Sequence, residues 1–391
     1  MRRPRVAGMS TPLLGATEAE LRRDRTSVKW VAYPPDVLPL WVAEMDAAPC
    51  PAVTRAVSEA MHRGDTGYGW GPRYAAAVAG YAHDAWGWEL DPDASMIVPD
   101  VMIGAAELLR LLTDEGGPVV VSPPVYDSFF GFVDAIGRRR VDAPLTATGR
   151  LDPEALRAAF RSATTNGERA AYLLCNPQNP TGTVHSPAEL ASLAALAEEH
   201  GVRVVADEIH APLVYPGGPA FTPYLSVPGA ERGFCVFSPS KGWNLAGLKS
   251  ALATAGRDAV DDFRGLSEVH THGSSHIGAI GHVAAMADGR DWLARLVAEL
   301  DANRAVLGRL LAEHLPAVRW QVPESTYLAW LDCRDLGLGD DPASVFRERG
   351  RVALGSGPRY GPEQGRGFAR LNFATSPVLL EEAVRRMATV T

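Results

Sequence analysis

Four short apolar runs, separated by helical patterns, constrain the fold of this chain more than any other feature. They cover residues 119–122, 170–175, 202–206 and 235–238 and are rich in β-branched and small apolar residues. Such runs are typical of strands that are buried on both faces of a parallel sheet. Because strands that alternate with helices pack into a sheet with helices around it, the sequence predicts an α/β fold.

The helix expected between the second and third runs carries clear signals at both ends. Ser186 can cap its N-terminus, Pro187 suits its first turn, and Glu189 completes a capping box. Gly201 can end the helix before the next strand begins. We therefore expect a helix between these residues, with its apolar face packed on the sheet.

The pattern changes after residue 289. A long amphipathic helix is followed by predicted strands around 326–331 and 368–373, and the Gly/Pro-rich residues 355–367 are predicted to form a loop. A chain of 391 residues can form one large and one smaller domain. We predict an N-terminal segment (1–50) that contributes to the small domain and the active site, a large domain (51–288) and a small C-terminal domain (289–391).

Residues 238–249, Ser-Pro-Ser-Lys-Gly-Trp-Asn-Leu-Ala-Gly-Leu-Lys, place one lysine among short hydroxyl residues and a second cation eight positions later. The amine of Lys241 can form a Schiff base with the aldehyde of pyridoxal 5′-phosphate (PLP). Ser238, Ser240 and Lys249 can bind the phosphate of that cofactor. A segment of this composition is by default a solvated loop, so the interpretation as a PLP site depends on the other motifs in the chain.

Asp207 directly follows the run 202–206, at the carboxyl end of a predicted strand, where the active sites of open α/β sheets lie. A carboxylate there can pair with the protonated pyridine nitrogen of PLP and keep the ring an electron sink. The alternative is a helix cap, which is the commoner role of an aspartate after a strand. The combination with Lys241 favours the cofactor.

Residues 175–182, Cys-Asn-Pro-Gln-Asn-Pro-Thr-Gly, follow the second run and contain two Asn-Pro pairs. Such pairs favour a rigid, extended turn at the end of a strand. Asn179 in this turn can donate its amide to the phenolic oxygen of PLP. Plain turn chemistry also accounts for the prolines and Gly182, but not for a third motif that suits the same cofactor.

With these motifs in this order, the chain resembles the fold-type I PLP enzymes of the class I/II aminotransferase superfamily over nearly its whole length. Residues 38–46, Leu-Pro-Leu-Trp-Val-Ala-Glu-Met-Asp, and 207–210, Asp-Glu-Ile-His, are similar to the cystathionine β-lyase, or C-S lyase, branch of the MalY/PatB type. The resemblance implies PLP as the cofactor and a mostly parallel, seven-stranded sheet in a large domain, with a smaller α+β domain.

The resemblance also implies roles for residues around the cofactor. Lys241 corresponds to the Schiff-base lysine, Asp207 to the partner of the pyridine nitrogen, and Asn179 to the ligand of the phenolic oxygen. His210 stands near that oxygen, where relatives often have a tyrosine. Tyr126 matches the aromatic residue that stacks on the cofactor ring, and with Lys241 and Asp207 it forms the expected catalytic set.

Further residues are assigned to the phosphate by the resemblance alone. Ala105 and Ala106 match a turn at a helix N-terminus whose backbone amides hold the phosphate, an arrangement that the helix dipole favours. Tyr68 resembles a tyrosine that reaches the phosphate from a partner subunit. The resemblance thus implies a homodimer with an active site shared across the interface.

The expected substrate-binding residues are Arg370, Asn179 and Trp41. Arg370 matches the arginine that binds the α-carboxylate of the substrate, a task that suits a bidentate guanidinium. Two positions depart from the pattern of the branch: Glu44 stands where the C-S lyases usually carry aspartate, and Gln178 replaces a common histidine.

The resemblance implies cleavage of cystathionine or another cysteine S-conjugate by α,β-elimination, which yields a thiol, pyruvate and ammonia. An aminotransferase that acts on an L-amino acid is the alternative, because the same residues serve both reactions. A regulatory or interaction protein with a PLP fold is the third interpretation. The intact set of Lys241, Asp207, Asn179 and Arg370 argues against the third as the sole role.

The bulk properties favour an enzyme with a small-molecule substrate. A formal net charge of −8 argues against a nucleic-acid surface. No apolar stretch after the basic residues 1–5 is long enough for a signal peptide or a membrane span, so we expect a cytoplasmic protein without membrane partners.

The cysteines and histidines do not form a metal-binding pattern. The four cysteines are far apart and are expected to be reduced thiols in the core. His272 and His276 are four residues apart and follow His270, but no glutamate completes a metalloprotease pattern. We therefore predict no metal, and a loop near the cofactor or the subunit interface.

Overall fold

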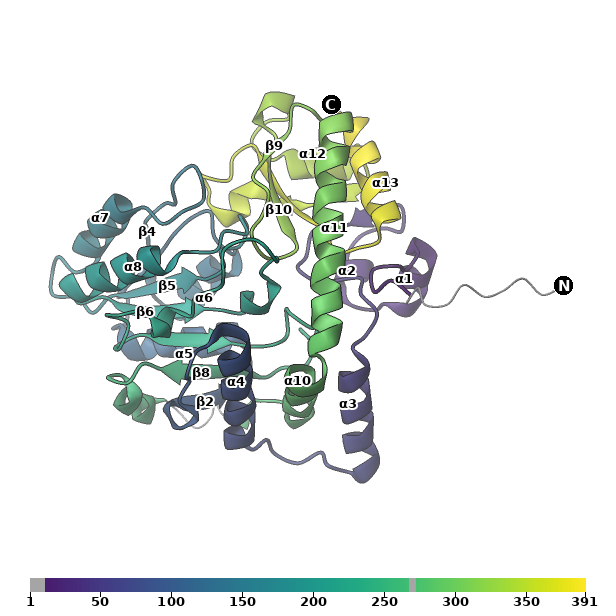
Figure 1. The fold of residues 1–391 in the computed structure, drawn as a ribbon. Coiled ribbons are helices and arrows are strands. Elements are labelled where there is room, and N and C mark those ends of the chain that lie inside the picture. Colours follow the sequence, from purple (N-terminus) through teal and green to yellow (C-terminus); the bar gives the residue numbers. More distant parts are fainter. Residues whose placement is uncertain (1–10, 267–271) are drawn as a thin grey trace.

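The computed structural model describes residues 11–266 and 272–391, so His270 lies outside the described residues (Figure 1). Its centre is a seven-stranded sheet. In spatial order the strands are β2 (Ser95–Val98), β8 (Ala251–Ala255), β7 (Phe234–Phe237), β6 (Arg203–Asp207), β5 (Ala171–Cys175), β3 (Pro118–Val121) and β4 (Arg139–Asp142). Strand β8 pairs antiparallel with β2 and β7, whereas the pairs from β7 to β4 are parallel. The predicted mostly parallel sheet is confirmed.

Helices cover both faces of this sheet. One face packs against α5 (Val101–Leu112) and α6 (Ser128–Ala135), and the other against α7 (Pro153–Ala163) and α8 (Pro187–Glu199). Along β5, Leu173 belongs to the first core cluster and its neighbours Tyr172 and Leu174 to the second. Successive strand residues point to opposite faces, so the continuous apolar runs reflect burial on both sides.

Helix α8 has the ends that its sequence predicts. The Ser186 hydroxyl accepts a hydrogen bond from the Glu189 amide at 3.2 Å, and the Glu189 carboxylate accepts one from the Ser186 amide at 2.8 Å. Pro187 is its first residue, and Gly201 follows with a φ of +67°, which favours glycine. The local signals therefore suffice to place this helix.

The C-terminal part combines a second sheet with three helices. Its strands, in spatial order, are β12 (Gly355–Ser356), β13 (Phe368–Asn372), β10 (Leu328–Asp332) and β9 (Arg319–Trp320). The helices are α11 (Arg290–His314), α12 (Pro342–Glu348) and α13 (Pro377–Ala388), of which α11 is the long upright helix that reaches down to α10 in Figure 1. The predicted smaller α+β part is confirmed, while the boundaries at residues 50 and 288 stay a prediction.

The expected loop 355–367 is partly wrong. It begins with strand β12, in which Gly355 lies opposite Arg370 of β13, and continues into a 3-10 helix at Gly357–Tyr360. A strand of two residues is determined by its pairing partner and leaves no periodic pattern in the sequence.

The N-terminal segment connects the two parts of the molecule. It contains α1 (Glu18–Asp24), α2 (Val28–Val31) and β1 (Leu38–Pro39), and β1 pairs in parallel with β11 (Val352–Ala353). The helices α3 (Pro51–Arg63), α4 (Gly71–Trp86) and α10 (His276–Asp288) pack together at the side of the large sheet (Figure 1).

The described helices and polar side chains bear on membrane and metal binding. No described helix is both long and apolar enough to cross a membrane. No group of three or more His, Cys, Asp and Glu side chains within 11–266 and 272–391 could hold a metal ion. The Nε2 atom of His276, a histidine of the 270–276 region, is hydrogen-bonded to the Asp65 carboxylate at 2.9 Å at the start of α10. The absence of a metal stays a prediction.

Candidate active site

A cavity of about 200 Å³, the inner cavity, lies at the carboxyl ends of β5, β6 and β7. This is the edge at which open α/β sheets bind their ligands. The structure gathers here eight of the residues that the sequence singles out. The inner cavity is lined by Ala43, Asp100, Val101, Met102, Tyr126, Phe132, Cys175, Asn179, Asp207, Ile209, His210, Ser238, Ser240, Lys241, Ala246, Leu248, Lys249 and Ser250.

Asp207 is the last residue of β6 and only 3% of it is exposed. One carboxylate oxygen accepts a hydrogen bond from the Ile209 amide at 3.1 Å. Burial raises the pKa of this carboxyl group to about 7. The next helical turn, at Ala211–Leu213, begins after His210, so Asp207 does not cap it and its side chain borders the cavity.

Lys241 reaches the cavity from the turn that follows β7. Its amine donates a hydrogen bond to the backbone carbonyl of Ala43 at 2.8 Å. Burial, together with the nearby positive charge of Arg370, lowers the pKa of the amine to about 8. The lowered pKa increases the fraction of this amine that is uncharged and nucleophilic near neutral pH.

His210 and Asn179 lie on the same cavity wall as Asp207. Burial lowers the pKa of His210 to about 3, so the imidazole is neutral, and its Nδ1 is buried without a hydrogen-bond partner among the described residues. Asn179 accepts a hydrogen bond from the Arg370 guanidinium through its Oδ1 at 3.1 Å. The amide nitrogen of Asn179 therefore points away from that contact.

The far end of the inner cavity is rich in anion-binding groups. The Ser238 hydroxyl donates to the Ser250 carbonyl at 2.9 Å and accepts from the Ser240 amide at 3.3 Å. Lys249 forms an ion pair with Asp100 at 2.9 Å. Because Asp100 caps α5, the first turn of that helix also faces this end of the cavity.

The prediction for Ala105 and Ala106 is wrong. Helix α5 begins at Val101, because the Asp100 carboxylate accepts a hydrogen bond from the Ile103 amide at 2.8 Å. Ala105 and Ala106 thus lie in the second turn, buried and away from the cavity lining. Val101 and Met102 border the cavity instead. The cap at Asp100 is the sequence signal that could have found them.

A second cavity of about 410 Å³, the outer cavity, shares Ala43, Tyr126 and Lys241 with the inner one. Its other lining residues are Tyr33, Trp41, Val42, Asp127, Ser128, Asp341, Ala343, Ser344, Arg347, Leu354, Gly355, Ser356, Arg359, Tyr360 and Arg370. The lysine amine therefore lies where the two cavities meet.

Arg370 is held firmly on β13. Its guanidinium donates to the Trp41 carbonyl at 2.8 Å and lies 4.8 Å from the centre of the Tyr360 ring. Its Nε is buried without a hydrogen-bond partner among the described residues. A buried guanidinium with an unused donor is suited to binding a carboxylate.

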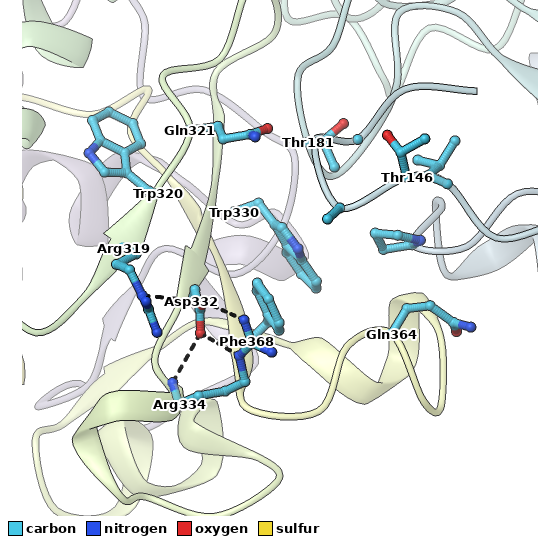
Figure 2. A pocket seen from close by; sticks show the side chains of 14 residues that line it. Thr146, Thr181, Arg319, Trp320, Gln321, Trp330, Asp332, Arg334, Gln364 and Phe368 are labelled. Atoms are coloured by element: carbon cyan, nitrogen blue, oxygen red, sulfur yellow. Dashed lines mark hydrogen bonds and ion pairs between the residues drawn. The ribbon is translucent and has the colours of Figure 1, made fainter. Parts of the chain in front are cut away.

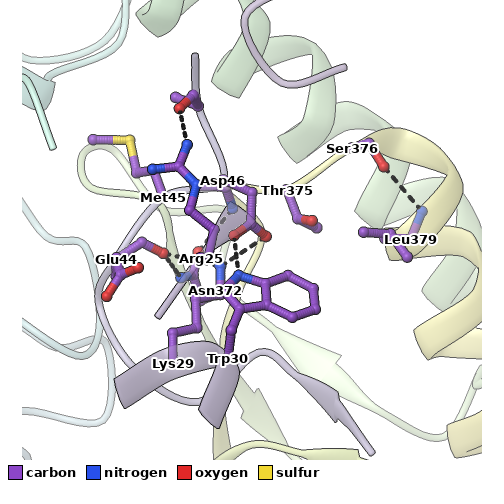
Figure 3. A network of polar contacts seen from close by, with 12 residues as sticks. Arg25, Lys29, Trp30, Glu44, Met45, Asp46, Asn372, Thr375, Ser376 and Leu379 are labelled. Atoms are coloured by element: carbon purple, nitrogen blue, oxygen red, sulfur yellow. Dashed lines mark hydrogen bonds and ion pairs between the residues drawn. The ribbon is translucent and has the colours of Figure 1, made fainter. Parts of the chain in front are cut away.

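Residues 41–46 contribute Trp41, Val42 and Ala43 to the outer cavity and Ala43 to the inner one, and a buried ion pair holds this segment in place (Figure 3). Lys29 and Asp46 are 0% and 2% exposed and lie 2.8 Å apart. The Trp30 indole also donates to Asp46, and the Asn372 amide donates to the carbonyls of Val42 and Glu44, each at 2.7 Å. Sequence reasoning missed Lys29 and Asn372, since no motif marks such long-range contacts.

The two residues that depart from the C-S lyase pattern do not line either cavity. Glu44 accepts a hydrogen bond from the Ser27 hydroxyl. Gln178 donates to the backbone carbonyl of Pro124 at 2.9 Å. Both side chains therefore contact residues behind the cavity walls and do not form the cavity surface themselves.

Tyr68 lies apart from both cavities. It belongs to the connection between α3 and α4 and is 89% exposed, and Trp70 beside it is 72% exposed. The role of Tyr68 toward a partner subunit stays a prediction.

A third cavity, of about 370 Å³, lies beside the second sheet and is lined by Trp320, Trp330 and Phe368 (Figure 2). Its charged side chains are already paired, Arg334 with Asp332 at 2.7 Å and Arg319 with Asp335 at 2.8 Å. None of the residues that the sequence singles out for chemistry is part of its lining.

Comparisons with known proteins identify the family. The model of the family "Aminotransferase class I and II" matches residues 35–387. A Mycobacterium tuberculosis protein named "Putative cystathionine beta-lyase" is 51% identical, and the match covers 96% of this chain and 97% of that protein. The cystathionine beta-lyase of Corynebacterium glutamicum is 33% identical, over 95% of this chain and 99% of the relative. The predicted resemblance to the C-S lyase branch is thereby confirmed.

Solved structures agree. A Corynebacterium diphtheriae protein described as a "putative plp-dependent beta-cystathionase" is 35% identical, with a TM-score of 0.89 and coverage of 96% of this chain and 98% of that chain. A PLP-bound C-S lyase from Staphylococcus hominis, at 23% identity and a TM-score of 0.85, covers 94% of this chain and 96% of its own, and shares the fold. The chain therefore belongs to the class I and II aminotransferase family and is a PLP-dependent enzyme.

Proposed function

We propose that this enzyme cleaves the Cβ–S bond of cystathionine or another cysteine S-conjugate and releases a thiol, pyruvate and ammonia. The observation that carries the proposal is the position of the Lys241 amine, where the inner and outer cavities meet. Relatives named cystathionine beta-lyase, at 33% identity and above, support the C-S lyase over other members of the family.

The residues of the inner cavity fit PLP. Asp207 is a buried acid without an ion-pair partner of its own among the described residues, and the His210 Nδ1 lacks a hydrogen bond, so both have capacity for a polar ligand. Lys241 would anchor the aldehyde and Tyr126 would cover the ring. We assign Asp207 to the pyridine nitrogen, Asn179 and His210 to the phenolic oxygen, and Ser238, Ser240, Lys249 and the first turn of α5 to the phosphate.

The protein groups would then carry the proton and hold the substrate. PLP, when bound, supplies an electron sink for the pair left by the broken Cα–H bond. Arg370 would bind the α-carboxylate, prepositioned by its contacts with Asn179 and Trp41. The Lys241 amine, whose pKa is lowered to about 8, would accept the Cα proton. The thiolate would leave from Cβ with the electron pair of the C–S bond, toward the outer cavity.

We also propose a cytoplasmic homodimer in which Tyr68 reaches the active site of the partner. The exposed aromatic side chains of Tyr68 and Trp70 support an interface at this connection. The four cysteines are free thiols, which suits a reducing compartment. Sedimentation of the wild-type protein and of Tyr68→Ala at equal concentration checks the dimer, and a monomeric wild type would contradict it.

The test of the reaction is incubation of the PLP-loaded enzyme with L-cystathionine in the absence of a keto acid. Sustained release of pyruvate and free thiol over many turnovers is expected. Conversion of the cofactor once to its amine form, without pyruvate, would instead establish the aminotransferase. That second candidate has support from a 28% identical relative named probable N-succinyldiaminopimelate aminotransferase.

A further inference from the structure

The outer cavity carries charge in an ordered pattern along α12. Asp341 precedes the helix, and Ser344 and Arg347 follow at intervals of three residues, so the three side chains share one face. All three line the outer cavity. The rise of the helix separates the first and last by about 9 Å. An anion, a hydroxyl and a cation thus succeed one another along a single wall.

Arg347 is available to a ligand in a way that its neighbour Arg359 is not. Arg359 is paired with Asp127 at 2.7 Å. Arg347 contacts the adjacent Glu348 at 3.3 Å, and the Glu348 side chain is 68% exposed. A pair as exposed as this contributes little, so an incoming carboxylate can replace it at low cost.

Asp341 has an unused acceptor. Its Oδ1 is buried and has no hydrogen-bond partner among the described residues. The carboxylate does not cap α12, since no side-chain hydrogen bond to the helix is formed. An unpaired carboxylate oxygen removed from water is unfavourable, and a ligand ammonium in the outer cavity would stabilise it.

In the proposed elimination, the thiol part of the substrate leaves toward the outer cavity and would occupy it. Arg370 and Lys241 occupy its inner end, and the α12 face lies among the remaining walls. A plain alkyl group there would bring no partner for Asp341 or Arg347 and would remove water from both. A leaving thiol with its own ammonium and carboxylate would offer each of them the opposite charge.

We propose that the α12 face is a subsite for the distal amino-acid head of the substrate. Asp341 binds the distal ammonium and Arg347 binds the distal carboxylate. The Ser344 hydroxyl, which donates to the Asp341 backbone carbonyl at 2.7 Å, accepts a hydrogen bond from the same ammonium. The proposal rests on the proposed function and narrows it to thioethers with an amino acid at both ends. Asp341 and Arg347 are then specificity-determining residues of the leaving group.

A binding measurement tests the subsite without any turnover. L,L-2,7-diaminosuberate replaces the sulfur of cystathionine by a methylene and cannot be eliminated, and L-2-aminoheptanoate lacks the distal head. By calorimetry on the PLP-loaded enzyme, we expect the first to bind about 10- to 100-fold more tightly, as for hydrogen bonds between charged groups. Equal affinities would overturn the proposal, whether or not the enzyme is a lyase.

Variants then assign the effect to the residues. In Arg347→Met and, separately, Asp341→Asn, the ratio of kcat/KM for L-cystathionine to that for S-methyl-L-cysteine should fall about 10- to 100-fold, mostly through KM. Arg385→Met removes an exposed helical arginine that is paired with Glu381 and should keep the ratio. An unchanged ratio in both subsite variants contradicts the proposal. Failure of the wild type to release pyruvate from either compound would sink the lyase function alone.

Discussion

The inner and outer cavities share three residues, yet they are built from different kinds of sequence. The inner cavity collects the ends of neighbouring strands of one sheet and the turn 238–249. The outer cavity collects segments that are far apart in the chain, from Tyr33 to Arg370. One sheet edge thus supplies most of the side chains for the cofactor chemistry that we propose, whereas the choice of leaving group depends on how the N-terminal segment and the C-terminal sheet meet.

The largest effect is expected from Lys241→Ala, which removes the amine common to both cavities. Loss of a proton-transfer group lowers turnover about 10²- to 10⁴-fold, and the cofactor should lose its lysine-linked absorbance. The measurement is steady-state pyruvate release with a spectrum of the loaded protein. Retained turnover would show that the reaction does not depend on the Lys241 amine.

Lys29→Met should destabilise the segment 41–46, which lies against both cavities, without removing a side chain that lines either one. It leaves Asp46 buried without its cation, which is expected to lower the free energy of unfolding by about 3–5 kcal/mol. Urea unfolding measures this, with Arg385→Met as the control, because an exposed pair contributes at most about 1 kcal/mol. If Lys29→Met and Arg385→Met were equally stable, contacts other than the ion pair would hold residues 41–46 in place. The double variant Lys29→Met/Asp46→Leu should recover part of the loss.

Arg370→Ala should separate binding from chemistry. Without the guanidinium the α-carboxylate loses its charged hydrogen bonds, so KM should rise about 10- to 100-fold, with a smaller change in kcat. Arg370→Lys keeps the charge without the bidentate geometry, so its KM should lie between those of the wild type and Arg370→Ala. Unchanged KM in Arg370→Ala would assign the carboxylate to another cation of the outer cavity.

Asp207→Asn should lower the activity of the enzyme and raise the free energy of unfolding of the cofactor-free protein. The pKa of Asp207 is raised to about 7 in the folded chain, so ionisation of this carboxyl group favours unfolding. The resulting loss in the free energy of unfolding grows between about pH 4 and pH 7 and is complete above pH 7. In the cofactor-free protein the variant should therefore gain roughly 1–3 kcal/mol at pH 8 and clearly less at pH 5. Thermal unfolding at both pH values measures this. An equal gain at the two would rule out the ionisation as its cause.

Local patterns were enough to predict the parallel sheet and the ends of α8. The runs 170–175 and 202–206 match β5 and β6 to within one residue, because continuous burial on both faces leaves an apolar signature. Lys241, Asp207 and Asn179 could be singled out, since each follows a predicted strand whose carboxyl end faces the same cavity. The family and its cofactor follow from those motifs and are confirmed.

Features that depend on contacts between distant residues could not be predicted. The ion pair of Lys29 with Asp46 and the pairing of Gly355 with Arg370 have no local signal. The α12 face likewise belongs to no motif, as its three residues matter only after α12 packs against the active site. The prediction that Ala105 and Ala106 bind the phosphate fails for another reason. Asp100 caps α5, so the first turn of the helix begins at Val101.

Binding of the cofactor in the inner cavity through Lys241 is what the proposed chemistry depends on most. The chain has only three lysines, Lys29, Lys241 and Lys249, which makes the claim directly testable. Borohydride reduction of the PLP-loaded protein, followed by peptide mapping by mass spectrometry, locates the modified lysine. We expect the reduced cofactor on Lys241 alone; its presence on Lys249 or Lys29 would show that another amine binds it.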